Sequence, residues 1–211
     1  MNPIFDPACR RCPRLAAFLD SVHLREPEYF CRPVAPFGDP AARLLIVGLA
    51  PGLRGANRTG RPFTGDHAGI LLYQTLYRYG LASGPVSESA TDGLRLNDAR
   101  ITNSVKCVPP ANKPLPAEIK ACNAYLRAEL EQSLNTRVIL ALGTIAHAAV
   151  LRACGLPADQ FRFAHAAEHG LADDRVLIDS YHCSRYNTQT RRLTAEMFES
   201  VIERARDLAQ A

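Results

Sequence analysis

The stretch "RLLIVGLAPGLRGANRTGRPFTGD" (43–66) joins a short apolar run to a long polar loop. The run "RLLIVG" is rich in aliphatic residues and ends at a glycine, which is typical of a buried strand. The loop at 48–66 holds five glycines, three arginines and a single carboxylate. Glycines let a backbone approach a ligand closely, and arginines suit phosphates. The stretch predicts a strand whose carboxyl end opens into a binding loop.

Three more short apolar runs follow and alternate with helical patterns. The predicted strands are 43–48, 101–105, 137–143 and 175–180, and the predicted helices are 68–80, 116–133, 144–155 and 193–210. Such alternation indicates an α/β fold with right-handed crossovers. We therefore expect three αβα layers around a central, mostly parallel four-stranded sheet.

The composition is that of an ordinary globular protein. The chain has 211 residues, of which 47% are hydrophobic and 22% charged, so we expect a single domain spanning residues 1–211. The sequence contains no apolar stretch of membrane-spanning length and no secretory signal pattern at "MNPIFDPACRRCPRL", so we expect a cytoplasmic protein without membrane contact. A net charge of +4 permits an anionic partner without requiring one.

Four of the seven cysteines form two groups. Cys9 and Cys12 make a C-x2-C pair, and Cys107 and Cys122 bracket a proline-rich loop. A reducing compartment argues against a disulfide framework. Four soft ligands suit zinc or an iron–sulfur cluster, and burial as small apolar side chains is the alternative.

Ligands of open α/β sheets bind at the carboxyl edge of the strands. This rule brings four polar segments together, and none is a dinucleotide or Walker motif. They are "GLAPGLRGANRTGRPFTGD" (48–66), "NSVKCVPPAN" (103–112), "GT" (143–144) and "SYHCSRYNTQTRR" (180–192).

Together these segments resemble the uracil-DNA glycosylase superfamily, most closely its family 5 (type-b) enzymes with an iron–sulfur cluster. "GLAPG" (48–52) with "NRTGRPFTGD" (57–66) resembles the first motif, "NSVKCVPPANKP" (103–114) the second and "SYHCSRYNT" (180–188) the histidine motif. The resemblance implies a monofunctional DNA glycosylase that flips uracil out of DNA and hydrolyses its N-glycosidic bond, leaving an abasic site for base excision repair. It also implies a 4Fe–4S cluster on Cys9, Cys12, Cys107 and Cys122.

The resemblance also assigns roles in binding the flipped base. Phe63 corresponds to the aromatic residue on which the base stacks, and His182 to the histidine that donates to the base oxygen. Asn103 is placed to read the pyrimidine edge, because an amide both donates and accepts; a turn or capping amide is the alternative. A second amide, Asn112, and the backbone at Gly48, Ala50 and Gly52 complete the expected base site. Cys183 stands where the family often has proline.

Water activation has two candidates. Many superfamily members carry a carboxylate or amide where this chain has Ala50, an absence that family 5 shares. Asp66 corresponds to the proposed catalytic aspartate, although an aspartate directly before a helix is also a favourable N-cap. Asn57 is the other candidate for orienting the water.

Basic residues in the motif loops predict contacts with the DNA backbone. We expect Arg58, Arg61 and Arg185 to bind DNA, with Arg185 or Tyr186 inserted into the vacated stack. Other candidates are Arg54, Lys106, Lys113, Arg191 and Arg192. A monomer is the simplest expectation.

Two other classes of function compete with the glycosylase. One is an electron-transfer protein built on the cysteines, which has no use for the histidine motif. The other is a nucleic-acid-binding module that keeps the fold but releases no base. Whether hypoxanthine or xanthine is also accepted stays open, because Ala50 says little about pocket width.

Overall fold

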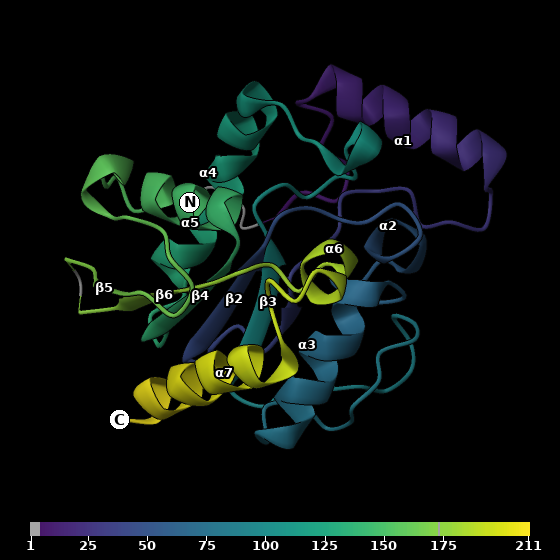
Figure 1. Ribbon diagram of the computed structural model, residues 1–211. Helices are drawn as coiled ribbons and strands as arrows, with labels where there is room; N and C mark the ends of the chain where they lie inside the picture. Colours follow the sequence, from purple (N-terminus) through teal and green to yellow (C-terminus); the bar gives the residue numbers. More distant parts are fainter. Residues whose placement is uncertain (1–4, 173) are drawn as a thin grey trace.

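The computed structural model describes residues 5–172 and 174–211 (Figure 1). At its centre lies a six-stranded sheet in the order β1-β3-β2-β4-β6-β5. The strands are β1 (Phe37–Gly38), β2 (Leu44–Gly48), β3 (Ala99–Asn103), β4 (Val138–Leu142), β5 (Glu168–Gly170) and β6 (Val176–Ser180).

The four central strands are parallel, as expected from the sequence. Strand β2 pairs with β3 on one side and with β4 on the other, and β4 pairs with β6. The expected count of four strands was too low, because β1 and β5 each add a short antiparallel edge strand. Edge strands of two or three residues are too short for an alternating pattern, so the sequence carries little signal for them.

Helices cover both faces of the sheet. Figure 1 shows α3 and α7 on one side and α4 and α5 on the other. The helices are α1 (Pro13–Arg25), α2 (Ala56–Thr59), α3 (His67–Arg78), α4 (Pro116–Gln132), α5 (Thr144–Ala153), α6 (Arg185–Gln189) and α7 (Ala195–Gln210), with 3-10 turns at Pro110–Asn112 and Ala158–Gln160.

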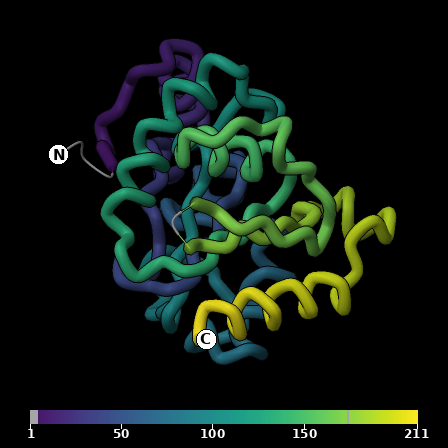
Figure 2. Tube along the Cα trace, turned by 90° about the vertical axis from the view of Figure 1, so that its left-hand side faces the viewer, coloured from purple at the N-terminus to yellow at the C-terminus, as the bar shows by residue number. Residues whose placement is uncertain are grey.

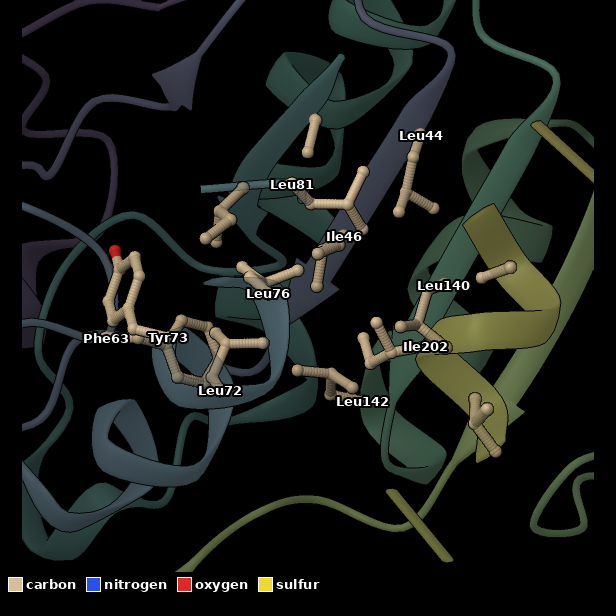
Figure 3. Close-up of a cluster of buried hydrophobic side chains, with 14 of the residues drawn as sticks. Leu44, Ile46, Phe63, Leu72, Tyr73, Leu76, Leu81, Leu140, Leu142 and Ile202 are labelled. Carbon is tan, nitrogen blue, oxygen red and sulfur yellow. The ribbon is translucent and has the colours of Figure 1, made fainter. Parts of the chain in front are cut away.

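Strand β2 shows how this layering follows from the sequence. Successive side chains of a strand point to opposite faces. Leu44 and Ile46 therefore pack toward α3 and α7, with Leu72, Leu140 and Ile202 nearby (Figure 3). Leu45 and Val47 belong to the other core, under α4 and α5. Both faces are buried, which explains the continuous apolar run and confirms the three-layer α/β fold.

Helix α1 was missed from the sequence, although it carries a helical signal. Proline is favourable at the first helical position, and the buried Leu15, Leu19 and Val22 recur at helical spacing. The bidentate bond between Arg14 and Glu118 ties this helix to α4, at 2.8 Å and 2.7 Å. Figure 2 shows the N-terminal segment at the end of the molecule opposite the C-terminus.

None of the helices within residues 5–172 and 174–211 is long and apolar enough to cross a membrane.

Candidate functional site

A cavity of about 650 Å³ opens at the carboxyl ends of the parallel strands. The loops after β2, β3, β4 and β6 all line it, which is the juxtaposition expected from the sequence. Nine of the candidate residues lie on its wall: Ala50, Gly52, Arg54, Phe63, Asp66, Asn103, Asn112, His182 and Arg185.

Phe63 and Asn103 lie above Gly48 at the end of β2. A Cβ atom on Gly48 would lie 2.5 Å from the Asn103 side-chain oxygen and 2.6 Å from Phe63 Cζ. Gly48 thus makes room for both side chains. Phe63 has a φ of +54°, a region that bulky residues rarely adopt. Its carbonyl fits against Gly69, where an added Cβ would come within 1.8 Å of that oxygen.

His182 lies beside Phe63. The two rings stack with centroids 5.9 Å apart and planes inclined by 27°. Burial lowers the pKa of His182 to about 4, because the charged imidazolium would lose its hydration. The ring is therefore neutral at physiological pH. The Asn187 amide donates to the His182 carbonyl at 2.8 Å and holds its loop.

Asp66 is the N-cap of α3 and also lines the cavity. One carboxylate oxygen, Oδ1, accepts from the Gly69 N–H at 3.1 Å. The other, Oδ2, lies against the first loop, where a Cβ atom on Gly52 or Gly55 would come within 3.0 Å or 2.4 Å of it. Burial raises the pKa of Asp66, and the backbone bonds from Gly69 and Ala68 oppose this rise. The capping role is observed, and the second oxygen lies beside Gly52 and Gly55, which also line the cavity.

The structure places Asn57 away from the reacting centre, contrary to its expected role. Its side chain is fully buried, and its amide donates to Cys31 Sγ at 3.6 Å. Its oxygen has no partner among the described residues. Asn57 lies in the short helix α2, which turns its side chain toward Cys31.

Two of the expected DNA-contacting cations are buried in ion pairs. Arg61 is 5% exposed, bonds to Asp92 at 2.6 Å and lies over the Phe37 ring. Lys106 is 1% exposed and lies 3.5 Å from a Glu129 oxygen. Both expectations are corrected, because a buried and paired charge is not available to a phosphate.

Other cations and one aromatic ring stand at the rim. Arg54 and Arg185 line the cavity, and Arg58 is exposed beside them, donating to the Arg54 carbonyl at 2.9 Å. Tyr186 is 70% exposed. The rim therefore combines positive charge with an exposed ring.

A second, smaller cavity lies between the start of α1, α4 and the segment after β3. We call it the thiol cavity, because Cys9, Cys12, Cys107 and Cys122 line it. The Lys106 N–H donates to Cys122 Sγ at 3.3 Å. Burial, with the neighbouring thiols, raises the pKa of Cys107 to about 12. Four thiols line this one cavity, and zinc and iron–sulfur clusters are commonly held by sulfur donors of this number.

Sequence reasoning missed some parts of the wall. Leu53 and Ile145 are partly exposed apolar residues at the cavity, and Gly55 makes room for Asp66. Single apolar residues in loops carry no distinctive pattern. The glycines of the first loop were the available signal for Gly55.

Comparisons with known proteins agree with this geometry. The family model of the uracil DNA glycosylase superfamily matches residues 35–206. A type-5 uracil-DNA glycosylase of Thermus thermophilus is 48% identical over 207 residues, covering 96% of this chain and 94% of the relative. One from Mycobacterium tuberculosis is 43% identical, covering 95% and 78%.

More distant similarity extends to another type. A type-4 uracil-DNA glycosylase of Archaeoglobus fulgidus is 35% identical over 140 residues, covering 66% of this chain and 56% of the relative. The long, full-coverage matches are to type-5 proteins. The chain therefore belongs to the uracil-DNA glycosylase superfamily and, within it, to the type-5 uracil-DNA glycosylases.

Proposed function

We propose that this chain excises uracil from DNA by hydrolysing the N-glycosidic bond of a flipped nucleotide, without cutting the DNA strand. One observation carries the proposal. A single cavity brings together an aromatic face, a buried amide, a neutral imidazole and a carboxylate. These are the groups needed to hold a base, read its edge and stabilise the charges that develop as it leaves.

Base recognition rests on Phe63 and Asn103. The Phe63 ring offers a π-face at the cavity wall, and base–aromatic stacking contributes about 1–3 kcal/mol. Asn103, at the end of β3, is only 3% exposed, so its amide is largely shielded from water. The amide can both donate to and accept from a pyrimidine edge. Asn112 and the backbone at Ala50 and Gly52 border the same space.

Bond cleavage leaves the electron pair on the base and positive charge on the sugar. The neutral His182 ring donates an N–H to the base oxygen on which negative charge develops. Asp66 stabilises the positive sugar, and water then adds to the sugar carbon. Water supplies the hydroxyl group to the sugar and, overall, a proton to the released base.

The rim fits a DNA backbone. Arg54, Arg58 and Arg185 supply positive charge next to the cavity, where phosphates flanking a flipped nucleotide would lie. Tyr186 and Arg185, the two residues considered for insertion into the stack, are both exposed, and the Tyr186 ring suits stacking between bases.

We further propose that Cys9, Cys12, Cys107 and Cys122 hold a 4Fe–4S cluster. Support comes from four sulfur donors around one cavity and from the backbone N–H that bonds to Cys122 Sγ. When bound, the cluster supplies metal–ligand energy that becomes folding energy. It ties the N-terminal segment to α4 and to the loop after β3.

The test uses a duplex with a single uracil and the same duplex with thymine at that position. Purified protein is incubated with each, and abasic sites are then cleaved with alkali. Cleavage of the uracil strand alone is expected, and only after alkali. A bound but uncleaved uracil strand would indicate a silent binding module and overturn the proposal. Cutting without alkali would overturn its monofunctional part.

A further inference from the structure

A cluster of three titratable side chains includes a residue of β6, the strand that leads into the His182 loop. Asp179, on β6 three residues before His182, is fully buried. Its Oδ1 lies 2.8 Å from His147 Nδ1, and its Oδ2 lies 3.0 Å from His169 Nε2. Each oxygen of one carboxylate thus faces a different imidazole.

With Asp179 ionised, the hydrogen bonds of His147 require one proton more than a neutral ring carries. Its Nε2 lies 2.9 Å from the Phe161 carbonyl, which can only accept, so Nε2 carries a hydrogen. Its Nδ1 faces the Asp179 carboxylate at 2.8 Å. A neutral ring would point a lone pair at that negative charge. His169, in contrast, satisfies its bond to Asp179 as a neutral tautomer.

The surroundings keep this proton inside the cluster. The rings of Phe161 and Phe163 pack edge-on against His169 and His147, each pair with centroids 5.7 Å apart. Two ionisable groups on the neighbouring segments have other partners, and Arg162, between Phe161 and Phe163, is exposed to solvent. Glu168 binds Arg204 at 2.7 Å, and His165 Nδ1 accepts from the Tyr181 N–H at 3.2 Å.

From α4, the side chain packed against α5 is a neutral amide. Asn123 donates to the Ala149 carbonyl at 2.8 Å. No further cation in this part of the described structure is bonded to Asp179, so His147 supplies its counter-charge.

We propose that His147 is held as an imidazolium with both ring nitrogens protonated, in a buried ion pair with Asp179 that positions the His182 loop. The protonation state stands on the hydrogen-bond geometry with Asp179 ionised, whereas the positioning role rests on the proposed function. Burial raises the pKa of Asp179, and its hydrogen bonds with His147 and His169 oppose this rise. Buried charges of this kind need both partners, and removing one leaves an uncompensated charge.

The pair joins two segments that line the cavity of about 650 Å³ at the carboxyl ends of the parallel strands, which we call the active cavity. His147 stands one turn into α5, and its N–H bonds to the Gly143 carbonyl at 3.1 Å. Gly143 in turn donates to the Ser180 carbonyl at 2.8 Å, and a Cβ atom on it would lie 3.5 Å from His182 Cβ. The ion pair therefore fixes the start of α5 against the end of β6. His147 and Asp179 are positioning residues, because they act through His182.

A divalent cation is the other way to supply the positive charge. The three ligand atoms lie within 4.8 Å of one another. Two observations favour the proton: the oxygens of Asp179 are used separately, and both contacts have hydrogen-bond lengths.

Asp179→Asn is the decisive variant, because it keeps every hydrogen bond without the extra proton. Its amide nitrogen can donate to His147 Nδ1, and its amide oxygen can accept from His169 Nε2. Nitrogen-15 NMR of the histidine rings, at about pH 8 where a free imidazole is neutral, measures the difference. We expect two protonated nitrogens on His147 in the wild type and one in Asp179→Asn.

Single-turnover uracil release supplies the second measurement. Asp179→Asn should lose roughly 10-fold, because its hydrogen bonds remain but the two charges are gone. Asp179→Ala, which leaves the cluster unpaired, should lose about 100-fold through misplacement of His182. A neutral His147 in the metal-free wild type, or stoichiometric zinc bound there in the purified holoprotein, overturns the protonation. Equal rates for the Asn and Ala variants overturn the positioning role. A protein without glycosylase activity but with a doubly protonated His147 would refute the proposed function and not the ion pair.

Discussion

The active cavity and the thiol cavity are built differently, although one segment after β3 lines both. Asn103 lines the first, and Cys107 lines the second. The active cavity is wide, and its wall holds an aromatic ring, an amide, an imidazole and a carboxylate. The thiol cavity is small and closed by Leu15, Val105 and Tyr125, and it gathers four like groups. Changes in the first should therefore alter chemistry, and changes in the second should alter folding.

The largest effect is expected in the thiol cavity. Cys107→Ala removes one of four proposed cluster ligands, so the protein should lose its iron and its brown colour. Since metal–ligand energy is folding energy, we expect at least ~4 kcal/mol of lost stability, or roughly 8–16 °C in Tm. Calorimetry and iron analysis after purification without air would measure both.

Cys154→Ala is the matched control, because Cys154 packs against the other core, away from the thiol cavity. It should keep iron and most of the stability. Colourless wild-type protein with stoichiometric zinc and no iron would show that a different metal occupies the thiol cavity.

The next effect is expected in the active cavity and should spare the fold. His182→Ala removes the donor to the base oxygen, and loss of such a donor costs about 10²–10³-fold in rate. Uracil-DNA affinity should change little, because the bond matters most once charge has developed. Single-turnover kinetics and binding assays separate the two quantities. His23→Ala, on the exposed side of α1, is the control. An unchanged chemical step would move the role to Asn112 or a backbone amide.

The sequence predicted those features that depend on neighbours along the chain. Strands β2 and β4 are continuous apolar runs, whereas β3 and β6 also contain polar residues. The polar loops after these four strands meet because parallel strands end at one edge. The N-cap at Asp66 is equally local, since it requires only an aspartate before a helix.

Features that depend on partners distant in the sequence could not be predicted from local patterns. Arg61 was predicted to contact a phosphate, but in the structure it forms an ion pair with Asp92, which is distant in the sequence. Lys106 was misread for the same reason, because Glu129 comes from α4. The bond between His147 and Asp179 joins a helix to a strand and leaves no local pattern.

Asp66 combines the two kinds of role, because it caps α3 and also lines the active cavity. Loss of the cap in Asp66→Ala should cost roughly 1 kcal/mol of stability. Asparagine caps about as well but carries no charge, so Asp66→Asn should stay stable and release uracil slowly if the carboxylate faces the sugar. Unfolding and single-turnover measurements on both variants distinguish the roles.

Thr194→Ala is a control for capping alone, because Thr194 caps α7 outside the active cavity. It should lower stability without slowing the chemical step. A folded Asp66→Asn protein that releases uracil at the wild-type rate would remove Asp66 from the chemistry. The first loop, from Gly48 to Gly52, would then be the next candidate for holding the water.

The smallest effect is expected on the pH dependence of stability, because burial in the active cavity lowers the pKa of His182. Its folded pKa of about 4 lies below the ordinary value of 6.5. Above the ordinary value the ring is neutral in both states and contributes nothing. Below it, the unfolded chain binds a proton that the folded ring excludes, so acid should lower stability by about 1–2 kcal/mol between about pH 7 and about pH 5. His182→Gln removes this titration, and its Tm should fall less than that of the wild type over the same range. Identical losses would show that the ring is hydrated in the folded protein, and that the active cavity does not hold it neutral.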